Sequence, residues 1–292
     1  ENNLPVLTED AGLFIDNGGQ MNFLIEGDNL ASLKLLEKTH KGKIDLICID
    51  PPYNTGRKDF VYDDVFVDAN DSFRHSKWLS FMEQRLKIAK DLLSDKGVIF
   101  VSIDDNEFSQ LKLLLDQLLG YENFVASLVW ETKREAKGIP PIKMCVTNQE
   151  YVLVYSKNNQ VKFLGEKRNV DDGFKNPDND PRGPWKRQYL QRFGQGFSVR
   201  TIVNPENNMV FSFESPYTEE KMNKWIEEGV IIFPTSPDKY PARKEYFYEY
   251  DNPFKPITTS LGIYSTKVNS EKLKELFDQK KVFDYSKPTQ LI

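Results

Sequence analysis

The chain has 292 residues, of which 39% are hydrophobic and 28% charged, and its formal net charge at pH 7 is −5. These proportions are typical of a globular protein and exclude collagen-like, disulfide-stapled and largely disordered chains. No apolar run approaches the ~18–20 residues that a membrane span needs, and the first residues lack the basic-then-apolar order of a signal peptide. We therefore expect a globular protein without a membrane partner.

The first half of the chain predicts an α/β domain. Residues 23–28 predict a short strand, and residues 29–38 predict a helix because their leucines recur at helical spacing. Residues 44–49 are almost continuously apolar, as in a strand of a parallel sheet that is covered on both faces. Residues 78–93 predict a helix with one apolar face, and residues 97–103 predict the next buried strand.

The following elements complete this sheet. Residues 106–119 predict a helix, with Gly120 as its C-cap. Residues 125–130 and 151–155 alternate like the two strands of a hairpin, joined by the polar loop 131–148. We expect a doubly wound sheet with this antiparallel pair at one edge.

The sequence changes character after residue 156. Residues 157–256 contain 17 aromatic residues and one clear amphipathic helix, at 219–228, so we expect an irregular, β-rich insertion. The predicted domains are 1–156, 157–256 and 257–292, and the last returns to the first domain with a short helix at 270–281.

Charge is distributed unevenly over these segments. Residues 1–156 hold 17 Lys and Arg against 25 Asp and Glu, or −8. Residues 157–256 hold 16 against 15, and residues 257–292 hold 6 against 4. An anionic partner is therefore best tolerated by the last two-fifths of the chain.

Cysteine and histidine content limits the compartment and the metal chemistry. Cys48 and Cys145 are the only cysteines and form no CxxC pair, so we expect reduced thiols and a cytoplasmic protein. Since His40 and His75 are the only histidines, no metal site is expected.

The most informative motif follows the predicted strand at 44–49 directly and is Asp50-Pro51-Pro52-Tyr53-Asn54-Thr55-Gly56. Pro, Asn and Gly mark ordinary turns, and a plain turn is the simpler interpretation. In open α/β sheets, however, ligands bind beyond the carboxyl ends of the strands, which is where this motif lies. The position favours a functional loop.

The motif and its flanks resemble the amino-methylating DNA methyltransferases of the adenine-N6 type, which use S-adenosylmethionine. The similarity covers most of the chain. It includes Ile25-Glu26-Gly27-Asp28-Asn29-Leu30, the helix at 78–93 leading to residues 97–105, the segment 150–157, and Tyr285-Ser286-Lys287-Pro288. The order, with the catalytic motif first and the Lys-Pro element late, resembles the β-class permutation. The motif with its flanks is most similar to the modification subunits of type III restriction systems.

This resemblance implies a Rossmann-like, S-adenosylmethionine-dependent methyltransferase sheet with an inserted target-recognition region. It implies catalytic roles for Asp50, Pro51, Pro52 and Tyr53. The Asp50 carboxylate and the Pro51 carbonyl are the candidate acceptors for the two N–H bonds of the target amine, and the prolines stiffen the loop. Tyr53 offers a ring on which a flipped base stacks, an interaction worth ~1–3 kcal/mol.

The resemblance also implies that Asp28, Asp50, Lys287 and Pro288 hold S-adenosylmethionine. Lys287 is suited to pair with the methionine carboxylate, although a surface lysine near a chain end is usually only solvated. Asp28 has an alternative role as the N-cap of the following helix. Asp at the first motif position favours adenine N6 over cytosine N4.

Candidate DNA contacts form one basic segment with interleaved aromatic residues. Its basic residues are Arg182, Lys186, Arg187, Arg192 and Arg200. This composition suits phosphate contacts, and the alternative is a solvated face over a small aromatic core. Lys133 and Arg134 lie in a second basic loop, which we expect at the substrate edge.

One family element is not found. A Gly-rich cofactor turn should follow the Lys-Pro element, and the Gly194-Gln195-Gly196 sequence does not replace it because its continuation predicts a strand rather than a helix. We therefore expect an incomplete sheet, and weak cofactor binding by these 292 residues alone.

The leading hypothesis is an adenine-N6 DNA methyltransferase of a restriction-modification system. The alternatives are a cytosine-N4 methyltransferase and a non-catalytic DNA-recognition module. Expected partners are double-stranded DNA and either a second copy or a restriction subunit.

Overall fold

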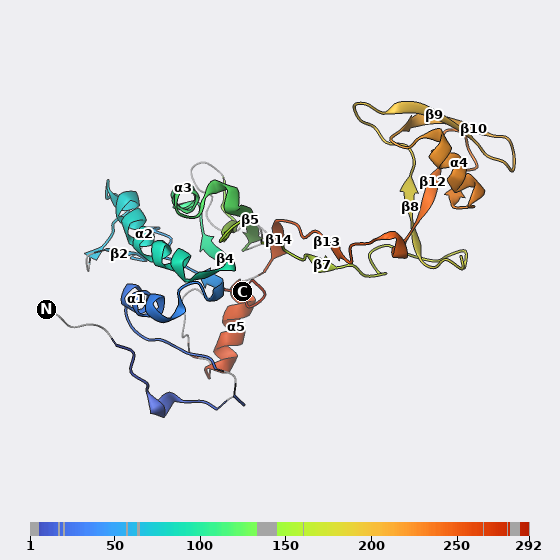
Figure 1. Ribbon diagram of the computed structural model, residues 1–292. Coiled ribbons are helices and arrows are strands. Elements are labelled where there is room, and N and C mark those ends of the chain that lie inside the picture. The colour runs from blue at the N-terminus through green and yellow to red at the C-terminus, as the bar shows by residue number, and fades with distance from the viewer. Residues whose placement is uncertain are drawn as a thin grey trace. The chain divides into compact units, whose positions relative to one another are not determined.

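The structure is a computed structural model (Figure 1). It describes residues 6–16, 18–19, 21–56, 58–62, 65–132, 145–159, 161–264, 266–278, 280 and 287–291. The chain divides into two compact units, one made of Glu1–Phe163 with Thr258–Ile292 and the other of Leu164–Ile257. The sequence places the corresponding boundaries at 157 and 256.

The first unit is built on a mixed sheet of five strands in the order β1-β4-β6-β5-β14. The strands are β1 (Ile44–Ile49), β4 (Leu93–Ile103), β5 (Phe124–Glu131), β6 (Gln149–Ser156) and β14 (Ser260–Ile263). β1 is parallel to β4 and β14 is parallel to β5, whereas β6 is antiparallel to both of its neighbours. The predicted β5–β6 hairpin is confirmed, but its predicted edge position is wrong because β14 adds beyond β5.

The described residues of this unit form four helices. They are α1 (Asn29–His40), α2 (Arg74–Leu92), α3 (Phe108–Leu119) and α5 (Thr266–Leu276), with the short turns η1 (Ala11–Leu13) and η2 (Tyr121–Asn123) and the small pair β2 (Val61–Tyr62) and β3 (Val65–Phe66). Alternate residues of β4, among them Ile99 and Val101, pack in one cluster with Trp78 of α2 and Leu111 of α3. The intervening residues of β4 contribute to a smaller cluster on the opposite side. The sheet edge that carries the motif is thus supported by α2 and α3.

Most of the predicted helices are confirmed, with shifted ends. α2 begins at Arg74, one turn earlier than predicted, and buries the predicted face that includes Met82 and Leu86. α3 ends at Leu119, and Gly120 is its C-cap, as predicted; the φ of +97° at Gly120 favours glycine. The helix predicted at 270–281 lies at Thr266–Leu276.

The strand predicted at residues 23–28 is wrong. These residues form no strand, and Phe23 and Leu24 are 77% and 95% exposed. An apolar segment becomes a strand only when a neighbouring strand accepts its backbone hydrogen bonds, and local sequence does not supply that neighbour.

The second unit is β-rich and irregular, as predicted. Its strands are β7 (Glu166–Lys167), β8 (Trp185–Tyr189), β9 (Ser198–Val203), β10 (Val210–Ser215), β11 (Ile231–Ile232), β12 (Ala242–Tyr246) and β13 (Phe254–Lys255), with α4 (Glu219–Glu227) and the turn η3 (Phe247–Glu249). They form a β11-β12-β8 sheet and two separate two-stranded ribbons, β9–β10 and β7–β13. Ile202, Phe213 and Trp225 belong to its own core. The strand predicted after Gly196 is confirmed as β9.

No helix among the described residues is both long enough and apolar enough to cross a lipid bilayer.

Candidate active site

The loop that follows β1 presents the predicted catalytic residues at the carboxyl end of the strand. The Asp50 side chain is 54% exposed. The Pro52 carbonyl accepts a hydrogen bond of 2.7 Å from the indole N–H of Trp78, which is fully buried in α2. Asp50 is therefore open to a ligand while the residues after it are anchored to the core.

Lys287 lies at this loop, although it is more than 230 positions away in the sequence. Its Nζ donates to the Tyr53 hydroxyl at 2.6 Å and to Glu150 Oε2 at 3.1 Å, and lies 3.4 Å from Asp50 Oδ1. The Tyr53 hydroxyl in turn donates to Glu150 Oε2 at 3.0 Å. We call Asp50, Tyr53, Glu150 and Lys287 the site cluster.

Aromatic rings complete the surroundings of the Lys287 ammonium. Nζ lies 4.9 Å from the centroid of the Tyr53 ring and 5.2 Å from that of Trp130 on β5. The face of an aromatic ring attracts a cation, most strongly where water is excluded, and the Lys287 side chain is only 14% exposed. Two carboxylates and two rings thus stabilise this charge.

Electrostatics keep the Tyr53 hydroxyl neutral. Burial raises the pKa of Tyr53 well above its ordinary value, and the nearby carboxylates of Glu150 and Asp50 raise it further. A neutral hydroxyl donates to Glu150 and accepts from Lys287 at the same time, so the ring has a fixed orientation at the mouth of the loop.

The Lys-Pro element is itself held in place. Asn269, which is 7% exposed on α5, donates from its side chain to the Lys287 carbonyl at 2.8 Å, and Pro288 is buried. The structure therefore brings together Asp50, Tyr53, Lys287 and Pro288 of the predicted site residues.

Asp28 is not part of the site cluster. Its carboxylate accepts from the Ala31 amide at 2.8 Å as the N-cap of α1, the alternative that the sequence left open. Its cofactor role stays a prediction.

Glu150 and Trp130 are the site residues that the sequence analysis missed. Glu150 lies on β6 within the segment 150–157, but an acidic residue at a strand end gives no indication of its partners. Only the pairing of β5 with β6, which places Trp130 opposite Glu150, locates them at the site.

The predicted DNA contacts of the second unit differ in how free their side chains are. The Arg182 guanidinium donates to both carboxylate oxygens of the buried Asp180, at 2.9 and 2.8 Å, and to the Glu228 carbonyl at 2.9 Å. Lys186 lies 3.4 Å from Glu245 and 4.9 Å from the rings of Phe174 and Tyr250. Both side chains therefore contribute to the unit's own packing.

Of the other predicted DNA contacts, three belong to the second unit and two lie outside the described residues. Arg187 on β8 and Arg192 are exposed, and Arg200 on β9 is half-buried with its Nε enclosed. Lys133 and Arg134 lie outside the described residues.

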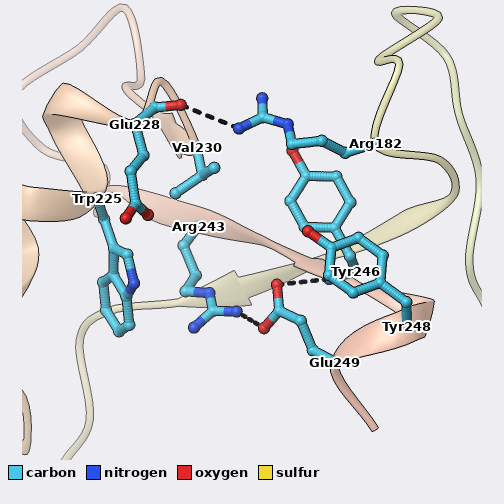
Figure 2. Close-up of a pocket in the computed structure, with 8 residues that line it drawn as sticks. All are labelled: Arg182, Trp225, Glu228, Val230, Arg243, Tyr246, Tyr248 and Glu249. Carbon is cyan, nitrogen blue, oxygen red and sulfur yellow. Dashed lines mark hydrogen bonds and ion pairs between the residues drawn. The ribbon is translucent and has the colours of Figure 1, made fainter.

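A cavity of about 390 Å³ lies beside Arg182 in this unit (Figure 2). Its walls include Trp225, Tyr246 and Tyr248. Arg243 in its wall pairs with Glu249 and stacks over the Trp225 ring at 4.6 Å. Because both guanidinium groups of this cavity have acceptors inside the unit, it is a structural feature rather than an open anion site.

Comparison with known proteins gives a consistent picture. A family model described as "DNA methylase" matches residues 44–292. The chain is 31% identical to the StyLTI Mod subunit, part of a type III restriction-modification enzyme of Salmonella typhimurium, over 100% of this chain and 49% of that protein. It is 35% identical to the EcoPI Mod subunit of Escherichia phage P1 over 76% of this chain and 38% of the relative. It is 37% identical to the EcoP15I Mod subunit of Escherichia coli over 54% and 27%. The chain thus spans about half, or less, of the length of these curated relatives.

Replacement of Asp28 tests its capping role. Because Ala cannot accept from the Ala31 amide, we expect Asp28→Ala to lower the free energy of unfolding by about 1 kcal/mol. Asp28→Asn keeps a side-chain acceptor and should therefore retain most of the parent's stability. Denaturant unfolding measures both. Asp16→Ala removes a similar contact to Gly18 outside any helix and is the control. Equal stability of Asp28→Ala and the parent would contradict the capping role.

Proposed function

The chain belongs to the DNA methylase family, and we propose from this premise that it transfers a methyl group from S-adenosylmethionine to the exocyclic N6 of an adenine in duplex DNA. The observation that carries the proposal is the half-exposed carboxylate of Asp50 at the carboxyl end of β1, within the site cluster. Ligands of open α/β sheets bind at this position.

Asp50 and the loop backbone supply acceptors for the amine. The lone pair of the N6 nitrogen is delocalised into the adenine ring, so the amine is a poor nucleophile. Two fixed acceptors, the Asp50 carboxylate and the Pro51 carbonyl, favour a pyramidal nitrogen with an available lone pair. As the new C–N bond forms and the carbon–sulfur bond of the methyl donor breaks, the nitrogen loses a proton, for which Asp50 is the proposed acceptor.

The donor set of the site cluster fits S-adenosylmethionine. This cofactor carries a carboxylate, an ammonium and a sulfonium, and the cluster offers one ammonium and two carboxylates beside aromatic rings. Lys287 is the proposed partner of the cofactor carboxylate, and Asp50 and Glu150 face its positive charges. When bound, the cofactor supplies an electrophilic methyl group.

We propose that part of the cofactor pocket comes from outside the described residues. β1 is the end strand of the sheet that the described residues form, so its outer backbone edge has no strand partner among them. Leu46, which pairs with Val98 and so projects from the face opposite α2 and α3, is 59% exposed. A further strand beside β1 would cover this edge and bring a second wall to the cofactor. The greater length of the relatives agrees with this proposal.

Adenine is favoured over cytosine because the motif begins with Asp rather than Ser. The target base must leave the duplex before its amine reaches Asp50, since pairing and stacking conceal it. Tyr53 is the proposed stacking partner. Its hydroxyl is held by Lys287 and Glu150, which orients the ring before the base arrives.

Partners and compartment follow from this reaction. We propose that the protein is the modification component of a restriction-modification system, because its relatives are Mod subunits of such enzymes. Double-stranded DNA is the substrate, and a restriction subunit or a second copy is the protein partner. The cytoplasm is the proposed location, in keeping with two free cysteines.

The second unit is proposed to recognise the DNA sequence. Among the predicted DNA contacts of this unit, Arg187 and Arg192 are exposed and Arg200 is half-buried, so Arg187 and Arg192 are the proposed phosphate contacts. Arg182 and Lys186 are proposed to support the unit instead, because their charges are already paired.

Loss of Asp50 tests the function. In the protein at its full natural length, we expect Asp50→Ala to lower methyl transfer about 10³-fold or more, because a fixed acceptor at the reacting amine is lost. Incorporation of labelled methyl groups into duplex DNA measures this. The control is Asp91→Ala, which removes a carboxylate of α2 that pairs with Lys41. Full transfer by Asp50→Ala would refute the proposed mechanism.

Salt dependence of DNA binding tests the role of the second unit. The slope of log affinity against log salt is about −0.9 per phosphate neutralised, so Arg187→Gln with Arg192→Gln should flatten it by about two units. Removal of Lys221 and Lys224, two exposed lysines of α4, is the matched control and should change the slope little. Equal flattening in both double variants would assign the effect to net charge alone.

A further inference from the structure

A polar cluster of two buried residues, Asn54 and Glu107, and the half-exposed His75 adjoins the loop of Asp50–Tyr53. Asn54 and Glu107 are both 0% exposed. The Asn54 side-chain amide donates to Glu107 Oε1 at 2.5 Å and to the Arg74 carbonyl at 3.3 Å. His75 Nδ1 lies 2.7 Å from the same Glu107 oxygen.

The hydrogen-bond directions within the cluster are determined by Arg74. Its Nε donates to His75 Nε2 at 3.2 Å, so Nε2 is an acceptor and Nδ1 carries the proton that His75 donates to Glu107. Glu107 Oε1 therefore accepts from two side chains, one on the motif loop and one on α2.

This arrangement is unfavourable for stability alone. Within the described part of the chain, Glu107 Oε2 and Asn54 Oδ1 are buried without a hydrogen-bond partner. Burial also raises the pKa of the Glu107 carboxyl. Unsatisfied buried oxygens cost free energy, and such costs are characteristic of sites where geometry matters more than stability.

The cluster acts on the backbone at the end of the motif. Asn54 has a φ of +57°, a conformation that Asn tolerates better than most residues. On the other side of Tyr53, the Pro52 carbonyl is bonded to Trp78. Tyr53 is thus held between two anchors, both of which reach α2, and Glu107 ties the second anchor to the start of α3.

We propose that Asn54, Glu107 and His75 are positioning residues that hold the Asp50–Tyr53 loop in its reactive conformation. The inference rests on the proposed methyl transfer and adds three residues to it that do not touch the target base. A displacement of about 1 Å at reacting groups lowers rates about 100-fold, so the hydrogen bonds of these three residues matter for the chemical step. We call Asn54, Glu107 and His75 the clamp.

Exchange of donor and acceptor between Asn54 and Glu107 tests the clamp. Asn54→Asp keeps the shape and the tolerance of positive φ but sets two carboxylates against each other. Glu107→Gln alone keeps an acceptor for Asn54 and His75 and should be mild. In the double variant Asn54→Asp/Glu107→Gln, the Gln amide donates to the Asp carboxylate, so this one hydrogen bond is restored with reversed direction. An amide nitrogen at the position of Oε1 no longer accepts from His75, whose half-exposed ring then turns to solvent, so the recovery is partial.

Single-turnover methyl transfer by the full-length protein separates positioning from folding. We expect Asn54→Asp to lower the rate constant about 100-fold with unchanged amplitude and unchanged affinity for DNA. The double variant should recover to within about tenfold of the parent. Asn208→Asp, at another positive-φ position, is the control and should match the parent.

The outcomes that overturn the clamp are distinct. A double variant no faster than Asn54→Asp, or a fall in amplitude rather than rate constant, would mean that the cluster only stabilises the fold. If Asn54→Asp does not fold, His75→Ala removes one of the two donors from a half-exposed position and should lower the rate constant about threefold to tenfold; an unchanged rate would overturn the proposal. No transfer by the parent itself would refute the proposed function and not the clamp alone.

Discussion

The charge of Lys287 is the constraint on which the site depends. The Lys287 side chain is only 14% exposed, so its ammonium needs polar partners in place of water. These partners are Asp50, Glu150 and the Tyr53 hydroxyl. Asp50 and Tyr53 come from the loop that follows β1, Glu150 comes from β6, and Lys287 itself lies in the last described segment of the chain. By gathering them, Lys287 joins the motif loop to the central hairpin and orients the ring of Tyr53. In the proposed reaction the same lysine meets the cofactor carboxylate, so its partners change when the pocket fills.

The sequence was most informative where chemistry is local. A motif directly after a buried strand predicts its own position, and the helix face with Met82 and Leu86 follows from spacing alone. Glu150 could not be found in this way, because its partners lie at residues 53 and 287 and meet it only after the sheet forms. Arg182 is predicted as a DNA contact from its charge; the sequence also shows Asp180 two positions earlier, but not that this carboxylate is buried and bonded to the guanidinium. The strand predicted at 23–28 failed for the related reason that strand partners are not local.

The two units have different physical tasks in this account. The first unit presents a half-exposed carboxylate on a loop whose far end is bound by buried hydrogen bonds, an arrangement suited to fixed geometry. The second unit has its own core and carries exposed basic residues on short sheets. In the proposed function, variation in the second unit changes the recognised sequence without changing the site cluster, because the cluster draws all of its residues from the first unit.

Identification of the methylated base is the most direct test of the central claim. Duplex DNA is incubated with S-adenosylmethionine and the protein at its full natural length, digested to nucleosides and examined by mass spectrometry. The expected product is N6-methyl-2′-deoxyadenosine. Formation of N4-methylcytosine instead, or of no methylated nucleoside by a folded protein that binds both the cofactor and the DNA, would contradict it.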